Sequence, residues 1–97
     1  EERQLTDNDF VNWGPYWHPG GKHVIYATSR HGHRNYELYL LKIDTGRQER
    51  VTHSPGADIL PVFSPDGRKL MWTSKRGENR AGRKESQLWI ADWVYGE

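Results

Sequence analysis

One hairpin pattern occurs twice in this chain of 97 residues. Residues 63–74 read FSPDGRKLMWTS and residues 17–28 read WHPGGKHVIYAT, each with a turn containing Pro and Gly between two apolar runs. The two copies align without a gap from Leu5 to His33 at an offset of 46 residues, and four extra residues in the second copy then raise the offset to 50. A period in the mid-forties with about four short strands per unit is typical of a β-propeller blade.

The segments between the turns have the character of strands. ILPVF at 59–63, KLMWTS at 69–74 and QLWIADW at 87–93 are short, rich in β-branched or aromatic residues, and bounded by Gly, Pro, Asp and Asn. They show no helical period and do not alternate cleanly between apolar and polar, so their sheets must be covered on both sides. The sequence therefore predicts an all-β fold of two four-stranded antiparallel blades.

The run LPVFSPDGRKLMWTS…SQLWIADW resembles the TolB-type, WD-like β-propeller repeat, in which an apolar strand ends in Ser-Pro-Asp-Gly and a second strand follows. Residues 47–93 match this pattern closely, whereas His18 and Gly20 replace its Ser and Asp in the first copy. The resemblance covers nearly the whole chain. It implies a propeller fold and a periplasmic or exported location, and it says little about the ligand.

The resemblance also implies four strands per blade, named A to D from the central channel outwards. Strand A is expected at Pro15–Trp17 and Leu60–Phe63, strand B at Val24–Thr28 and Leu70–Ser74, strand C at Glu37–Ile43 and Gln87–Trp93, and strand D of the first blade at Arg47–Thr52. The segment Glu2–Thr6 aligns with Gln48–Thr52 and is expected to be a strand D with no blade before it.

This assignment makes residues 1–97 one two-bladed unit. Residues 1–6 are an orphan outer strand, residues 7–52 are blade one, and residues 53–97 are blade two without its outer strand. Two blades cannot close a ring, and each end would expose an apolar sheet face and an unpaired edge. In one alternative, copies join by strand exchange between Glu2–Thr6 and Gln87–Trp93, and the family resemblance then favours six blades from three chains. In the other, the unit belongs to a longer propeller and meets its other blades in cis.

Residue types and spacing give no support for catalysis. The chain has no cysteine and no G-x-S-x-G motif, and Ser64 and Asp66 belong to a turn, so no catalytic residue and no cofactor are expected. His31 and His33 have the spacing of two metal ligands, but the second copy does not preserve them, and no metal site is expected. A net charge of +1 argues against nucleic acid as a partner. No apolar run approaches the roughly 20 residues that insertion across a membrane requires.

Large apolar residues occupy the positions of four tryptophans in the other copy, which predicts packing between blades. These four are Trp17, Trp72, Trp89 and Trp93. Trp13 differs, because it is expected in the connection from strand D to strand A, where it would reach a ligand at the channel mouth. A lectin function, with sugars stacked on exposed indoles, is therefore the least favoured interpretation.

Basic residues gather in the connections between strands B and C, which read SRHGHRN and SKRGENRAGRKES and hold seven of the 14 Lys and Arg residues. Loops on a rigid scaffold commonly carry binding, so this face, together with the connections from D to A, is the expected ligand-binding face. Its candidate residues are Trp13, Asp58, Arg30, Arg34, Arg76, Arg80, Arg83 and Lys84. The alternative is a solvated rim without a partner.

Two classes of function follow from the fold and the loops. The favoured one is a non-catalytic binding or scaffold module that recognises a protein or peptide on the loop-bearing face. The alternative is an accessory propeller domain of a larger exported hydrolase or peptidase, in which the ring filters substrates.

Overall fold

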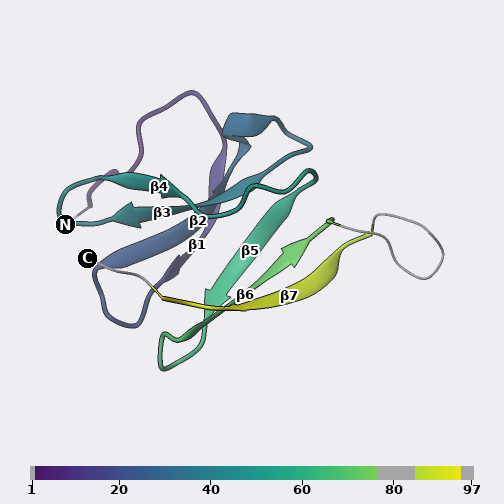
Figure 1. Ribbon diagram of the computed structural model, residues 1–97. Coiled ribbons are helices and arrows are strands. Elements are labelled where there is room, and N and C mark those ends of the chain that lie inside the picture. Colours follow the sequence, from purple (N-terminus) through teal and green to yellow (C-terminus); the bar gives the residue numbers. More distant parts are fainter. Residues whose placement is uncertain (1, 77–84, 95–97) are drawn as a thin grey trace.

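The computed structural model describes residues 2–76 and 85–94, which form two antiparallel sheets (Figure 1). The first sheet has the order β1-β2-β3-β4, with β1 at Asn12–Trp17, β2 at His23–Thr28, β3 at Glu37–Lys42 and β4 at Gln48–Arg50. The second has the order β5-β6-β7, with β5 at Asp58–Phe63, β6 at Lys69–Ser74 and β7 at Gln87–Asp92. A short 3-10 helix, η1 (Ser29–His31), follows β2. The predicted all-β fold with two antiparallel sheets is confirmed.

Both sheets begin with the same irregular strand, which shows the repeat at the level of the backbone. Asn12 pairs with Thr28 and Asp58 pairs with Ser74, and in each sheet the register then shifts at a bulge two residues further on. The bulge contains a residue with positive φ in both copies, Gly14 at 64° and Leu60 at 55°. Because of this bulge, strand A begins three residues earlier than expected in blade one and two residues earlier in blade two.

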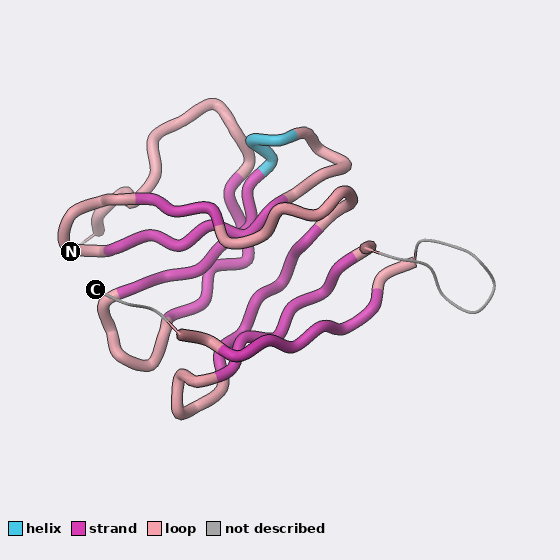
Figure 2. Tube along the Cα trace, in the orientation of Figure 1, coloured by secondary structure: helices cyan, strands magenta, loops and turns pink. Residues whose placement is uncertain are grey.

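The expected hairpin turns lie at one end of the molecule (Figure 2). The amide of Gly21 donates to the carbonyl of His18, and the amide of Gly67 donates to the carbonyl of Ser64, each at 2.9 Å. Both glycines have positive φ, as the Pro-Gly sequence pattern requires. The His18 ring joins the two equivalent turns, with Nε2 3.1 Å from the carbonyl oxygen of Gly67.

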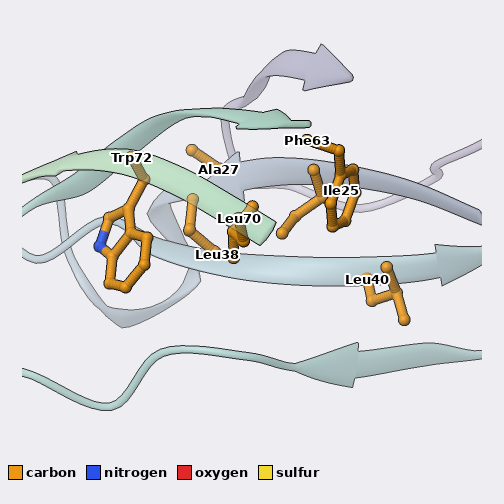
Figure 3. Packing of buried hydrophobic residues seen from close by; sticks show 7 residues of the cluster. All are labelled: Ile25, Ala27, Leu38, Leu40, Phe63, Leu70 and Trp72. Atoms are coloured by element: carbon orange, nitrogen blue, oxygen red, sulfur yellow. The ribbon is translucent and has the colours of Figure 1, made fainter. Parts of the chain in front are cut away.

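The core lies between the two sheets, as Figure 3 shows. One face of β2 and β3 meets one face of β5 and β6 there, and each buried aliphatic side chain stabilises the packing by roughly 1.5–3 kcal/mol. The buried members of this cluster are Ile25, Ala27, Leu38, Leu40, Phe63, Leu70 and Trp72. Packing between blades, expected from strands that are apolar on both faces, is therefore what joins the two halves of the chain.

The outer faces of the two sheets differ in exposure. On sheet one, Tyr26, Tyr39 and Leu41 form a second buried cluster. On sheet two, the outward-facing Leu88 and Ile90 are 75% and 59% exposed. Sheet two therefore ends in an uncovered apolar face among the residues described here.

Residues 2–6 are not in a strand, so the strand expected at Glu2–Thr6 is not formed in this chain. A strand needs a hydrogen-bonded neighbour, and these residues pair with none of the described strand edges. They lie instead over the outer face of sheet one, where Arg3 donates to the carbonyl of Ile43 at 3.1 Å. Strand exchange with another blade stays a prediction. No helix in the described part of the chain is long and apolar enough to cross a membrane.

Candidate functional site

The longer connections gather at the end opposite the hairpin turns (Figure 2), and we call this end the loop-bearing face. It is formed by residues 7–11, 29–36, 51–57 and 75–76. Backbone hydrogen bonds tie these loops together: the amide of Ser29 donates to Val11, and the amide of Lys75 donates to Ala57, at 2.9 and 3.0 Å. The loops are thus held on the two sheets as one surface.

Asp58, the first residue of β5, is the centre of a buried polar network beneath this face. Its side chain is fully buried, and its oxygens accept hydrogen bonds from Ser54 Oγ at 2.6 Å, Trp72 Nε1 at 3.1 Å and Arg76 at 3.2 Å. Burial by itself raises the pKa of this carboxyl, but the hydrogen bonds from Ser54, Ser74, Glu37 and Trp72 outweigh burial and lower the pKa. Asp58 is therefore held as a carboxylate.

Glu37, the first residue of β3, belongs to the same network and is also fully buried. Its carboxyl accepts a hydrogen bond from Thr52 Oγ1 at 2.6 Å and pairs with Arg50 at 3.2 Å. Burial above all, together with the neighbouring Asp58, raises the pKa of Glu37 to about 7, against the lowering effect of Thr52 and Arg50. Glu37 is thus the proton donor in its hydrogen bond to Asp58, and one proton is held between the two blades.

Arg76 joins this buried network to the surface. Its guanidinium carbon lies 5.2 Å from the ring centre of Trp72 and 5.1 Å from that of Trp89, while its nitrogens donate to Asp58 and to Ser74 Oγ. Its side chain is still 27% exposed. The two indoles and two acceptors fix the guanidinium in one orientation, which lowers the conformational cost of binding a planar anion.

Arg30 occupies the equivalent position in blade one. Its guanidinium carbon lies 4.8 Å from the ring centre of Tyr39 and 5.8 Å from that of Phe10, and it donates to Gln48 Oε1 at 2.9 Å. Tyr39 aligns with Trp89 in the repeat. The same arrangement thus occurs in both copies of the repeat, namely an arginine stacked on the aromatic residue of strand C.

A groove of about 600 Å³ runs between the blades beside Arg76. We call it the inter-blade groove. Its walls come from the chain that follows β4 and from β6 and β7 with the residues after them. The polar lining residues are Thr52, His53, Ser54, Arg76 and Asp92, and the apolar ones include Leu70, Trp72, Trp93 and Val94. This shape and lining suit an extended peptide with a carboxylate beside apolar side chains.

The structure places the expected site residues in different environments. Arg76 and Arg30 lie on the loop-bearing face and are partly buried, and Arg34 is exposed on the loop after η1. Asp58 and Trp13 lie in strands and not in the connections where they were expected, because both strands A begin earlier. The burial of Asp58 gives it a structural role. Arg80, Arg83 and Lys84 lie outside the described residues.

Trp13 is 41% exposed and packs edge-on against Tyr36, with the ring centres 6.1 Å apart. Of the tryptophans expected between the blades, Trp72 is buried, and Trp93 packs against Phe63 at 4.9 Å. Trp17 and Trp89 are 55% and 40% exposed in this chain, so the two sheets described here do not bury them, and their packing between blades stays a prediction. The guanidinium of Arg76 instead stacks on the ring of Trp89.

His31 and His33 lie near each other on the η1 loop but have different neighbours. His31 Nε2 is 2.8 Å from the hydroxyl of Tyr39, and burial together with nearby arginines lowers the pKa of its ring. The ring of His33 lies 6.2 Å from that of Tyr36. Among the described residues, no group of three or more His, Asp or Glu side chains is placed to hold a metal ion.

Sequence reasoning missed Glu37, which forms half of the buried acid pair. The available signal was an acidic residue in an apolar strand at a position where the second copy has Gln87. Its partner Asp58 is 21 positions away in another sheet, so no local pattern could join the two.

Residues 1–92 match the model of one protein family, described as the TolB beta propeller domain. Among curated proteins the chain is similar to the Tol-Pal system protein TolB of Francisella tularensis subsp. mediasiatica (strain FSC147), with 32% identity over 72 residues, 74% of this chain and 16% of the relative. The same protein from subsp. holarctica (strain OSU18) gives the same figures. The chain thus spans about a sixth of the length of these curated relatives.

The fold has a solved counterpart as well. A crystal structure of TolB from Acinetobacter baumannii superimposes with a TM-score of 0.77 and 28% identity, over 96% of this chain and 21% of that one. The resemblance inferred from the Ser-Pro-Asp-Gly pattern is confirmed.

Proposed function

The chain belongs to the TolB β-propeller domain family, and on this premise we propose that it is a non-catalytic module that binds a protein segment in the inter-blade groove. The curated relatives are named as Tol-Pal system proteins, and we propose that this chain likewise works as a component of such a system through a protein partner.

The observation that carries the proposal is the fixed guanidinium of Arg76. It is held by Asp58 and Ser74 and stacked on two indoles, yet part of it faces the groove. A planar guanidinium pairs well with a carboxylate, and here its orientation is set before any ligand arrives. The ligand proposed is an extended segment with Asp or Glu beside apolar residues.

Selection from a random peptide library tests this proposal directly. Peptides are selected on the 97-residue chain at low salt, and binding of the enriched sequences is measured by fluorescence anisotropy. We expect enrichment of an acidic residue next to apolar ones, and an affinity that falls as salt rises. Arg76→Lys keeps the charge but loses the planar fork, and it should weaken binding by about tenfold or more.

Arg47→Lys is the matched control, because Arg47 is 73% exposed on the hairpin between β3 and β4, away from the groove. It should bind like the unchanged chain. Enriched peptides without an acidic residue, or equal affinities for the Arg76 and Arg47 variants, would overturn the proposal.

A further inference from the structure

The packing of sheet two on sheet one shows which face of a blade its neighbour covers. Leu38 and Leu40 on β3 are 0% and 2% exposed because sheet two covers them. Leu88 and Ile90 occupy the same repeat positions on β7 and are 75% and 59% exposed. Within residues 2–76 and 85–94, nothing covers the face of sheet two that carries Leu88 and Ile90, and this face is the same kind of surface as the face of sheet one that sheet two buries.

Four polar residues close the contact between the blades at the loop-bearing end. Glu37 of strand C accepts hydrogen bonds from Thr52 and Arg50, which precede the second blade, and it shares a hydrogen bond with Asp58 in β5. Thr52 also accepts a hydrogen bond from the amide of Leu38 at 2.8 Å. Blade one thus supplies the acid Glu37, and residues at or before the start of blade two form hydrogen bonds with it.

The same four repeat positions at the two outer ends of the chain hold a matched neutral set. Glu37 aligns with Gln87, Arg50 with Gln4, Asp58 with Asn12, and Thr52 with Thr6. Each of the three charged residues becomes an amide, while the threonine is kept. Replacement of only one member would leave a buried charge without its partner, so the joint change is what a contact between these two ends requires.

The hydrogen-bonding capacity of the set is complementary as well. Asn12 donates through Nδ2 to Asn8 Oδ1 at 2.9 Å, as Ser54 bonds Asp58, but the buried Asn12 Oδ1 accepts no hydrogen bond among the described residues. The amide of Gln87 can donate to this oxygen and accept from the hydroxyl of Thr6. Both ends of the contact would then be satisfied.

The segment before blade one already lies where the contact needs it. Leu5 and Thr6 line a cavity on sheet one with Val24, Tyr26 and Leu41. At the same repeat positions, Val51 and Thr52 line the inter-blade groove with the equivalent residues of sheet two, namely Leu70, Trp72 and Ala91. Docking therefore requires no rearrangement of these two residues relative to the blade that follows them.

We infer that a second copy of this chain docks head to tail on sheet two, with its Gln4, Thr6 and Asn12 around Gln87 of the first copy. Leu88 and Ile90 then pack on the outer face of the second copy's sheet one. The contact joins two different surfaces, so it continues from copy to copy until a ring closes. Three copies give the six-bladed ring that the family resemblance favours.

Sedimentation measures the mass of the 97-residue chain in solution and so tests this inference. One variant places a buried negative charge in the contact, and a second variant adds a positive charge to pair with it. The unchanged chain should sediment at three times its mass of 11.4 kDa. At pH 8, Gln87→Glu places a carboxylate opposite Gln4, and the dissociation constant should rise by about a hundredfold or more because the buried charge has no partner. Adding Gln4→Arg rebuilds the pair seen between Glu37 and Arg50, and it should restore the assembly.

Arg47→Gln is the control, since it makes the same change in net charge on an exposed hairpin outside the contact, and it should leave the mass unaltered. Circular dichroism verifies that every variant keeps its fold. A chain that is monomeric at all concentrations would overturn the inference, and the faces would then be covered by other blades. An assembly that resists Gln87→Glu, or one that Gln4→Arg does not rescue, would overturn it equally.

Discussion

The carboxyl groups of Glu37 and Asp58 share a hydrogen bond between the two sheets, although one acid begins β3 and the other begins β5. Both side chains are fully buried. The proton that this bond requires is held because burial disfavours a second negative charge. The contact between the blades therefore depends on pH.

The first prediction is that stability falls as the pH rises from about 5 to 8. The pKa of Glu37 is raised from 4.5 to about 7 in the folded chain, so protonation favours folding. Its contribution is complete below the unfolded pKa and is lost as the pH rises through 7, by up to about 3 kcal/mol. Urea unfolding at a series of pH values measures this loss.

Glu37→Gln should remove this fall in stability, because an amide can donate to Asp58 and accept from Thr52 without titrating. The lowered pKa of His31 acts in the opposite direction and is unchanged by this substitution. Asp58, with its lowered pKa, affects stability only as the pH falls below about 3.8, outside this range. Parallel stability curves for the two chains between pH 5 and 8 would contradict the assignment of the proton to Glu37.

The second prediction compares two glycines in equivalent turns. Gly67 and Gly21 have φ of 74° and 78°, so alanine at either position costs about 1 kcal/mol in backbone strain. At Gly67 an added Cβ would also lie 2.7 Å from His18 Nε2, whereas at Gly21 it meets nothing within 4 Å. Gly67→Ala should therefore lower the melting temperature more than Gly21→Ala, by about 4–8 °C per additional kcal/mol. Equal losses would show that His18 moves away freely.

The third prediction is a stabilising substitution at the bulge of β5. Leu60 has φ of 55°, a left-handed conformation that the equivalent Gly14 adopts without steric cost. Because the Leu60 side chain is half exposed, Leu60→Gly should raise stability by up to about 1 kcal/mol. Thermal unfolding measures the change, and a loss of stability would mean that packing of Leu60 outweighs its backbone strain.

The fourth prediction concerns residues 1–6 and rests on head-to-tail docking. A chain without these residues loses Gln4 and Thr6, and with them the strand that would pair with β7 of the next copy. It should stay folded and sediment as a monomer. A truncated chain that sediments at the mass of the full assembly would contradict strand exchange.

The sequence by itself determined the two antiparallel sheets and their hairpins, and the family resemblance added the order of the strands. These features depend on local chemistry, such as the glycine of the Ser64–Gly67 turn. Each of them also occurs in both copies of the repeat, which makes the pattern easier to recognise. Strand ends were less accurate, because the bulge at Gly14 and Leu60 extends strand A beyond its apolar run. The family followed from the same turn pattern.

Only the tertiary structure decided which polar residues meet. Glu37, Asp58 and Arg76 come from three strands or loops in two sheets, and their proximity depends on how one sheet packs on the other. Burial then sets their chemistry, since the same carboxyl is an ordinary acid in water and a proton donor near pH 7 between the blades. Sequence patterns record the spacing of residues along the chain, whereas desolvation and hydrogen bonding depend on neighbours that the packing supplies.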